Sequence, residues 1–167
     1  ISTIESTVAS AVGLDIDISK PHGNMIVDIG GGTVNIATVS MGAVAQNDTL
    51  RLGSIDFDDA IIKYIRYSKN VLIGGQTAEH IKRTIGSAIM REFDITMRAK
   101  GRNIFTGLPE VFTVSASEIY TAINDLVMQI CAACQNVLES TDPDIVADIS
   151  KNGIYLLGGG AKLYGMD

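Results

Sequence analysis

The sequence has few of the residues that mark several common protein classes. Only two cysteines occur in 167 residues, so no disulfide framework is expected, which fits a reducing cytoplasm. No apolar run reaches about 18 residues and no signal peptide opens the chain, so we expect no membrane-spanning helix. Lysine and arginine total 13 against 19 acidic residues, without a basic cluster, which argues against nucleic acid as a partner.

Residue sets typical of hydrolases and of zinc sites are also missing. His22 and His80 are isolated, so no Ser-His-Asp arrangement is expected. Cys131 and Cys134 lack the second ligand pair that zinc usually needs, and we interpret them as buried or half-buried free thiols. Three aspartates could imitate a metal cluster, but their place near a helix start is explained more simply by the helix dipole. They are Asp56, Asp58 and Asp59.

What the chain does contain is typical of a globular fold. Hydrophobic residues make up 46% and charged residues 19%, and 167 residues suffice for one ordinary domain or two small ones. The chain starts at Ile1 without a methionine and stops at Asp167, a few residues beyond a glycine loop. We therefore expect it to be a fragment of a longer protein.

Two glycine triplets are the most informative feature. Each follows a short apolar strand-like run: Gly30-Gly31-Gly32-Thr33 comes after residues 25–29, and Gly158-Gly159-Gly160-Ala161 comes after residues 154–157. Consecutive glycines let backbone N–H groups approach a phosphate without interference from a Cβ atom. The pair predicts two walls of one nucleotide cleft, although a tight hairpin turn and a helix-entry turn are the simpler alternatives.

Asp28 lies two residues before the first triplet, at the end of its strand. A carboxylate there can position a phosphate-bound Mg²⁺ or a water molecule, whereas the simpler alternative is a turn-capping role. Neither triplet has Rossmann or P-loop spacing. Glu79 and Lys82 lie on adjacent turns of a predicted helix, and from these residues alone a surface ion pair is the better interpretation.

The order of elements predicts an α/β fold with a mixed sheet. A strand and a glycine-turned meander come first, and residues 54–114 then read as a small α+β insertion. Within it, Thr77 can cap a helix, and alternating apolar positions predict a strand over residues 93–99. Ser115 and Glu118 have the spacing of a capping box at the start of a long helix, and Pro143 opens a short one.

The string Gly23-Asn24-Met25-Ile26-Val27-Asp28-Ile29-Gly30-Gly31-Gly32-Thr33 resembles the second phosphate motif of the actin, Hsp70 and sugar-kinase superfamily. Four further strings make the chain most similar to the MreB family of bacterial actins, over essentially its whole length. They are Phe57-Asp58-Asp59-Ala60-Ile61-Ile62, Ile73-Gly74-Gly75-Gln76-Thr77-Ala78-Glu79-His80-Ile81-Lys82, Thr106-Gly107-Leu108-Pro109 and Gly153-Ile154-Tyr155-Leu156-Leu157-Gly158-Gly159-Gly160-Ala161.

This resemblance implies the second half of an actin-like, ribonuclease H-like fold. Residues 1–53 and 115–167 would form subdomain IIA, and residues 54–114 the inserted subdomain IIB. The implied ligands are ATP and Mg²⁺, with Asp28 as the catalytic and metal-positioning residue. The implied nucleotide contacts are Gly30, Gly31, Gly32 and Thr33 for phosphates, and Glu79, His80, Ile81, Lys82, Gly158, Gly159, Gly160 and Ala161 for adenosine and ribose.

The resemblance also implies a filament-forming cytoskeletal protein at the inner face of the cell membrane. Its partners would be further copies of itself and membrane-associated cell-wall machinery, with membrane contact through the missing half of the protein. The chain departs from the family at Val34-Asn35, where Thr-Glu is usual, and at Ser54-Ile55-Asp56, where Gly-Asp-Glu is usual. Two alternatives stay open: another ATPase or sugar kinase of the superfamily, and a non-catalytic adaptor with an actin fold.

Overall fold

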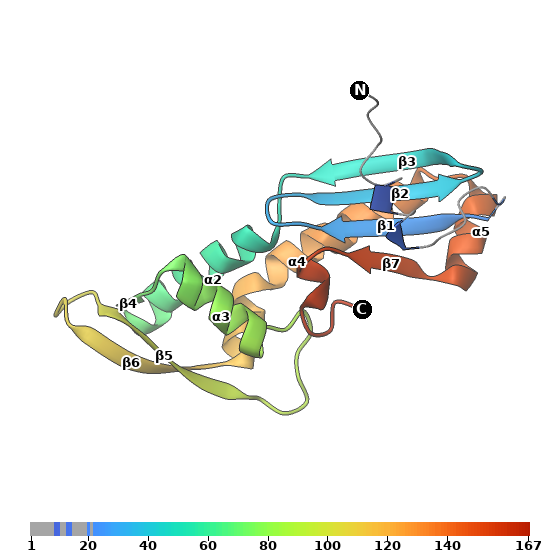
Figure 1. Ribbon diagram of the computed structural model, residues 1–167. Coiled ribbons are helices and arrows are strands. Elements are labelled where there is room, and N and C mark those ends of the chain that lie inside the picture. The colour runs from blue at the N-terminus through green and yellow to red at the C-terminus, as the bar shows by residue number, and fades with distance from the viewer. Residues whose placement is uncertain (1–8, 11–12, 15–19, 21) are drawn as a thin grey trace, which may run out of the picture. The chain divides into compact units, whose positions relative to one another are not determined.

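The computed structural model describes residues 9–10, 13–14, 20 and 22–167, which form two compact units (Figure 1). Unit 1 comprises Ile1–Gly53 and Gln129–Ala161, and unit 2 comprises Ser54–Met128 and Lys162–Asp167. Each unit has its own sheet and helices, so the mixed α/β class expected from the sequence is present. The subdomain boundaries at 54 and 114 stay a prediction, and most of a helix expected over residues 4–12 lies outside the described residues.

Unit 1 is built on a four-stranded sheet with the order β3-β2-β1-β7. β1 (Asn24–Ile29) and β2 (Val34–Ser40) are antiparallel, and β3 (Ala43–Leu50) continues the meander. β7 (Ile154–Leu157) pairs with β1 in parallel, from Met25↔Ile154 to Asp28↔Leu157. Because β1 and β7 are parallel neighbours, the loops that follow them emerge at the same edge of the sheet.

β1 is buried on both faces, as its continuous apolar run predicts. Ile26 packs with Val39 on one face, where Val44, Tyr155 and Leu157 join the cluster. The alternate residues of β1 are equally inaccessible: Met25, Val27 and Ile29 are at most 1% exposed. Burying an aliphatic side chain of this size stabilises a fold by roughly 1.5–3 kcal/mol. The strand that carries Asp28 therefore lies in the most buried part of unit 1.

α5 (Pro143–Asn152) is tied to the beginning of β1. The Gly23 amide donates to Asp148 Oδ2 at 3.1 Å, and Asn152 Nδ2 donates to the Gly23 carbonyl at 3.2 Å. A Cβ atom on Gly23 would lie 2.5 Å from the Ile145 carbonyl oxygen, so only glycine fits here. The predicted start is confirmed, since Pro143 opens the helix and the Asp142 side chain accepts from the Asp144 amide.

Unit 2 combines two packed helices with an antiparallel three-stranded sheet of order β4-β5-β6. The helices are α2 (Ser54–Lys69) and α3 (Gly75–Ile85), and the strands are β4 (Val71–Leu72), β5 (Thr96–Asn103) and β6 (Pro109–Ser115). The helices bury apolar stripes at helical spacing. These stripes are Phe57, Ile61 and Ile65 on α2, and Ala78, Ile81 and Ile85 on α3.

Two sequence-based expectations for unit 2 are wrong. Thr77 does not cap α3, because the N-cap is Gly74, which has extended backbone and offers no side chain for a cap bond. The strand expected from Phe93 begins only at Thr96, and Phe93 is 77% exposed in the preceding loop. Alternating apolar residues predict a strand only where the backbone finds a partner, and β6 pairs with β5 from Thr96 onward.

α4 (Ala116–Glu139) runs from unit 2 into unit 1 and begins with the predicted capping box. The Ser115 amide donates to Glu118 Oε2 at 3.0 Å, and the Glu118 amide donates to Ser115 Oγ at 3.3 Å. Each side chain thus satisfies a backbone donor that the helix leaves unpaired. No helix in the described part of the chain combines the length and the apolar character that crossing a membrane requires.

Candidate functional site

The two glycine corners meet at one edge of the sheet of unit 1. The first corner joins β1 to β2, and the second follows β7, the parallel neighbour of β1. The side chain of Asp28 lies against the second corner, since a Cβ atom on Gly158 would come within 2.7 Å of Asp28 Oδ1. Residues almost 130 positions apart in the sequence therefore share this edge, which agrees with the prediction of neighbouring loops.

The first corner exposes its backbone to solvent. The Gly30 amide donates to the Thr33 carbonyl at 2.9 Å, which closes the turn between Ile29 and Val34. Gly31, Gly32 and Thr33 are all exposed, and a Cβ atom on Gly32 would meet nothing within 4 Å. A closed turn of exposed glycines can bring its backbone amides close to an anion, because no Cβ atom stands in the way.

The second corner packs closely on the end of β1. Gly158 has a φ of +80°, and a side chain there would collide with the Ile29 carbonyl. Gly160 is buried, and a Cβ atom on it would collide with the Ile29 side chain. Gly159 is exposed, Ala161 is half-buried, and a short 3₁₀ turn follows over Gly160–Lys162. The expected α-helix entry is thus only a single 3₁₀ turn in the described chain.

Asp28 is half-buried at the end of β1. Among the described residues, none donates a hydrogen bond to its carboxylate or forms an ion pair with it. This does not support the turn-capping alternative, because a capping carboxylate would accept from a nearby amide. A half-buried carboxylate without a protein donor has its oxygens available for a cation or for water. Asp28 is therefore the best-placed acidic group at this edge.

Asn35 lies directly beside Asp28, on β2. Its side chain is held from the other side, because Thr49 Oγ1 on β3 donates to Asn35 Oδ1 at 3.0 Å. Leu157, Asp28, Asn35 and Thr49 thus form one row across the four strands. The amide group of Asn35 can orient a water molecule through its N–H groups, but it cannot accept a proton as a carboxylate can.

Gly53 also belongs to this edge, and sequence reasoning missed it. A Cβ atom on Gly53 would collide with the carbonyl of Gly31 and would lie 2.5 Å from the Gly32 amide nitrogen. The backbone at the end of unit 1 therefore packs directly on the exposed corner. The signal was available in the sequence, since an antiparallel meander returns the end of β3 to the start of β2, where the corner ends.

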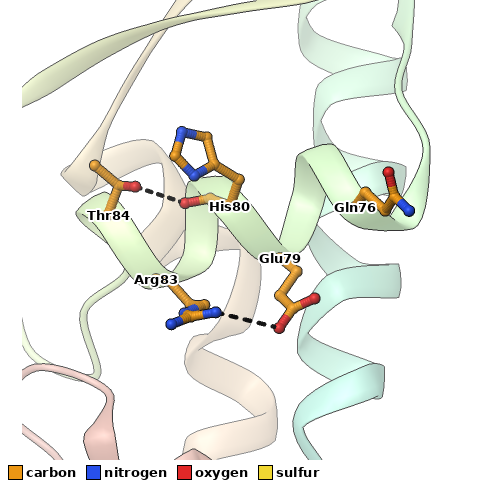
Figure 2. A pocket seen from close by; sticks show the side chains of 5 residues that line it. All are labelled: Gln76, Glu79, His80, Arg83 and Thr84. Carbon is orange, nitrogen blue, oxygen red and sulfur yellow. Dashed lines mark hydrogen bonds and ion pairs between the residues drawn. The ribbon is translucent and has the colours of Figure 1, made fainter.

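In unit 2, α3 lines a hollow of about 470 Å³. Five side chains line it: Gln76, Glu79, His80, Arg83 and Thr84 (Figure 2). Glu79 and Arg83 lie side by side with 3.9 Å between carboxylate and guanidinium, and Thr84 Oγ1 donates to the His80 carbonyl. Glu79 and His80 are exposed, so both can contact a ligand, whereas Ile81 is fully buried in the core of unit 2.

Lys82 points away from this hollow and ties α3 to the first turn of α2. Its ammonium donates to the Ser54 carbonyl at 2.7 Å and to Asp58 Oδ2 at 2.9 Å. Burial raises the pKa of Asp58 above its ordinary value, and the neighbouring Lys82 opposes that rise. The simple prediction of an ion pair between Glu79 and Lys82 is wrong, because each has another partner.

The remaining candidates from the sequence are the three aspartates of α2 and the two cysteines of α4. No group of three or more His, Cys, Asp or Glu that could hold a metal ion occurs among the described residues, which include Asp56, Asp58 and Asp59. Both cysteines are free on α4, and Cys134 is half-buried as expected. The expectation is wrong for Cys131, which is exposed because it lies on the outer face of the helix. Burial raises the pKa of Cys134 to about 11, so its thiol stays protonated and unreactive at neutral pH.

Comparison with known proteins agrees with the resemblance found in the sequence. The model of the family described as MreB/Mbl protein matches residues 1–167. Cell shape-determining protein MreB of Escherichia coli (strain K12) is 40% identical over 164 residues, which cover 98% of this chain and 47% of that protein. Cell shape-determining protein Mbl of Bacillus subtilis (strain 168) is 39% identical over 165 residues, covering 98% and 49%.

Solved structures agree on the fold. The crystal structure of MreB5 of Spiroplasma citri bound to ADP superposes with a TM-score of 0.94 at 36% identity, covering 98% of this chain and 50% of that one. The AMPPNP-bound structure of the same protein gives 0.92 at 37%, covering 98% and 49%. The MamK double helical filament, at 20% identity and a TM-score of 0.71 over 93% and 46% of the two chains, shows the actin-like fold alone. The chain spans about half the length of these relatives.

Proposed function

Because the chain belongs to the MreB/Mbl family, we propose that it forms half of an ATP-binding, filament-forming bacterial actin that organises cell shape and wall synthesis. One observation carries the nucleotide part of this proposal. Two glycine corners, one of them exposed, lie at one sheet edge together with the Asp28 carboxylate, which has no protein donor among the described residues. The structures of Spiroplasma MreB5 with ADP and AMPPNP show that a relative binds adenine nucleotides.

The phosphates of ATP would lie against the amides of Gly31, Gly32 and Thr33. Mg²⁺ would be held mainly by phosphate oxygens and water, because this ion keeps several of its waters and needs only one or two carboxylates. Asp28 fits that demand, since it is a single carboxylate, half-buried and without a protein donor. The ion would neutralise phosphate charge, while Asp28 orients a water molecule that the ion or the phosphates hold.

The nucleoside contacts come from the family resemblance. We assign Glu79 and His80 as direct contacts, because both are exposed beside the hollow of α3. The resemblance also implies contacts from Ile81 and Lys82. Ile81 is buried in the core of unit 2 and Lys82 is held by Asp58, so we propose that they position α3 and do not contact the ligand. On unit 1, Gly159, Gly160 and Ala161 would border adenosine.

Hydrolysis by the whole protein would be slow. Water would attack the γ-phosphate, and positioning and charge stabilisation would supply the catalysis. Position 35 holds asparagine where the family usually has glutamate. In the row of residues that contains Asp28, this leaves no second carboxylate that could accept a proton. That change also favours the second candidate, a non-catalytic adaptor that keeps the actin fold for partner contacts only. We expect the isolated chain to be inactive, because the opposing wall of the cleft is missing.

Assembly and location follow from the same proposal. Nucleotide binding would favour polymerisation with further copies, and the filaments would lie at the inner face of the cell membrane with the cell-wall machinery. Membrane contact would come from the other half of the protein. The MreB and Mbl relatives at about 40% identity are both described as cell shape-determining proteins, which supports this role.

The experiment is nucleotide binding by the full-length protein that carries this chain. Calorimetry should show Mg²⁺-dependent binding of AMPPNP that Gly158→Ala weakens at least about tenfold, because the added methyl group collides with β1 at the phosphate edge. Gly153→Ala is the matched control, since Gly153 has nearly the same positive φ but open space around its Cβ position. No binding by the folded wild-type protein, or equal affinity in both variants, would contradict the proposal.

A further inference from the structure

Cys131 and Cys134 are the two cysteines of the chain, and the proposed function uses neither of them. Both lie in the part of α4 that belongs to unit 1, and both are free. Because they are three residues apart, they are neighbours on adjacent turns of the helix. The chain therefore presents all of its thiol groups together, in one place on one helix.

The two sulfur atoms also interact with each other. Burial raises the pKa of Cys134, and the negative charge of the Cys131 thiolate raises that pKa further. Two charges affect each other in this way only when they lie close together, because their interaction falls with distance. The two residues between the cysteines are alanines, whose side chains end at Cβ. A cation bound by both thiolates would remove the repulsion between them.

Helix geometry favours a bridging ion over a disulfide. Residues three apart on a helix have Cβ atoms about 5–6 Å apart, whereas a disulfide needs Cβ atoms about 3.5–4.5 Å apart. Both cysteines lie in the interior of α4, so no frayed helix end is present to close that difference. An ion between the sulfur atoms adds two metal–sulfur bonds of roughly 2.3 Å each, which spans the helical separation without moving the backbone.

The ligands select a soft cation that needs few of them. Thiolates bind Cu(I) and Zn²⁺, whereas Mg²⁺ takes carboxylates and water. Zinc sites use at least three protein ligands, and no group of three or more His, Cys, Asp or Glu that could hold a metal occurs in the described part of the chain. On the next turn of α4, Glu139 is engaged by Gln135, whose Nε2 donates to it at 2.9 Å. Cu(I) is stable between two thiolates in a linear arrangement, so this pair is sufficient for it.

The different exposure of the two thiols suits uptake and retention of such an ion. Cys131 is exposed, so it can take Cu(I) from a dissolved carrier. Cys134 is half-buried, and its pKa of about 11 means that its proton leaves only when the metal replaces it. A thiol that coordinates a metal ion is deprotonated outright. Since the helix already holds the two sulfurs near each other, little conformational entropy is lost when the second bond forms.

We propose that Cys131 and Cys134 form a binding site for one Cu(I) ion, held between the two thiolate sulfurs on α4. Both thiol protons leave as the two copper–sulfur bonds form, and no oxidant or reductant takes part. The site shares no residue with the glycine corners or with the hollow of α3. It therefore goes beyond the proposed function, and it is tested without nucleotide.

The test is Cu(I) binding by the full-length protein, kept reduced and free of oxygen, in competition with a chromophoric Cu(I) chelator. Cys131→Ser and Cys134→Ser should each lose one Cu(I) ion per protein relative to wild type, or bind that ion at least about a hundredfold more weakly. The reason is that a single thiolate lacks the second sulfur that the helix supplies at high effective concentration. X-ray absorption of the wild-type complex should show two sulfur neighbours around copper.

Matched variants keep the number of thiols and change only their placement. In the Cys134→Ser background, Gln135→Cys puts a thiol four residues from Cys131, where it still faces that residue, and should restore binding to within about tenfold of wild type. Asn136→Cys puts it five residues away, about 140° around the helix, and should not restore binding. Both positions are exposed, so neither substitution disturbs the core. The thermal midpoint without copper checks that every variant is folded.

Three results would overturn the site. The first is a folded wild-type protein that binds no more Cu(I) than Cys131→Ser and Cys134→Ser do. The second is Asn136→Cys binding as tightly as wild type, because thiol number and not helical placement would then decide. The third is a reduced protein that binds no Cu(I) but forms a disulfide between the two cysteines with peroxide. A thermal midpoint that rises with added Cu(I) in wild type, and in neither serine variant, would support the site.

Discussion

Asp28 and Asn35 lie directly opposite each other on β1 and β2, at the sheet edge where both glycine corners emerge. Side chains of opposed residues on antiparallel strands are neighbours on one face of the sheet. In this pair only Asp28 carries a charge, and the Asn35 amide oxygen accepts from Thr49. Asp28 is therefore the one member of this pair that can position a cation or accept a proton.

Asn35→Glu should raise ATP turnover by the full-length protein. The new carboxylate would face the same edge as Asp28 and could take a proton from the attacking water, so we expect an increase of at least about tenfold in phosphate release. The rate is measured at saturating ATP, and AMPPNP affinity is measured in parallel. Thr49→Ala is the control, because it frees the residue 35 side chain without adding charge. Unchanged turnover with normal affinity would show that residue 35 does not act on water.

Gly53→Ala should weaken both the fold and phosphate binding. The added methyl group would collide with the Gly31 carbonyl and crowd the Gly32 amide, so the corner has to shift. Overpacking of this kind costs about 1–3 kcal/mol, measured as the free energy of unfolding in urea. Gly75→Ala lies in a helix with open space at its Cβ position and should be neutral or stabilising. If the two variants were equally stable, the backbone of Gly31 and Gly32 could shift to make room for the methyl group at little cost.

Lys82→Met should destabilise unit 2 by about 1–3 kcal/mol, because the mostly buried Asp58 carboxylate loses its cation. The pKa of Asp58 is already raised by burial, and removal of Lys82 raises it further. Since the folded state then binds a proton more tightly than the unfolded state, stability falls as pH rises through the range above the ordinary aspartate value. Urea unfolding at several pH values measures this slope.

The matched variant is Asp58→Asn in the Lys82→Met background. It removes the buried charge, so the additional pH dependence should disappear and part of the stability should return. If the stability of Lys82→Met depends on pH as that of the wild type does, water solvates the Asp58 carboxylate once Lys82 is gone, and the prediction is wrong. The same substitution also tests the nucleotide proposal, because a positioning role for Lys82 predicts a smaller loss of AMPPNP affinity than Glu79→Ala.

The sequence predicted the features that depend on local pattern. The nearly continuous apolar run of β1 predicts a strand that is buried on both faces. The spacing of Ser115 and Glu118 predicts the start of a helix. The meeting of the two glycine corners was also predictable, since each follows an apolar strand. It became certain only with the parallel pairing of β1 and β7.

Long-range partners were not predictable in the same way. Lys82 lies near Glu79 in sequence, but it pairs with Asp58, 24 residues away, because packing of α2 on α3 brings the carboxylate within reach. β4 has only two residues, too few for any periodicity to show. Gly53 differs from these cases, because the predicted meander already returned the end of β3 toward the first corner, although no residue pattern marked its contact with Gly31.

The capping box at the start of α4 gives a test of coupling within the fold. Ser115→Ala should cost about 0.5–2 kcal/mol, because the Glu118 amide loses its acceptor. Glu118→Ala should cost a similar amount, since the Ser115 amide loses Glu118 Oε2 and Lys69 loses an ion-pair partner at 2.6 Å. The double variant should cost less than the sum, because each side chain helps to hold the turn that the other needs. Ser150→Ala, on the exposed face of α5, is the neutral control. If the free energies of unfolding in urea were strictly additive, the two hydrogen bonds would form independently.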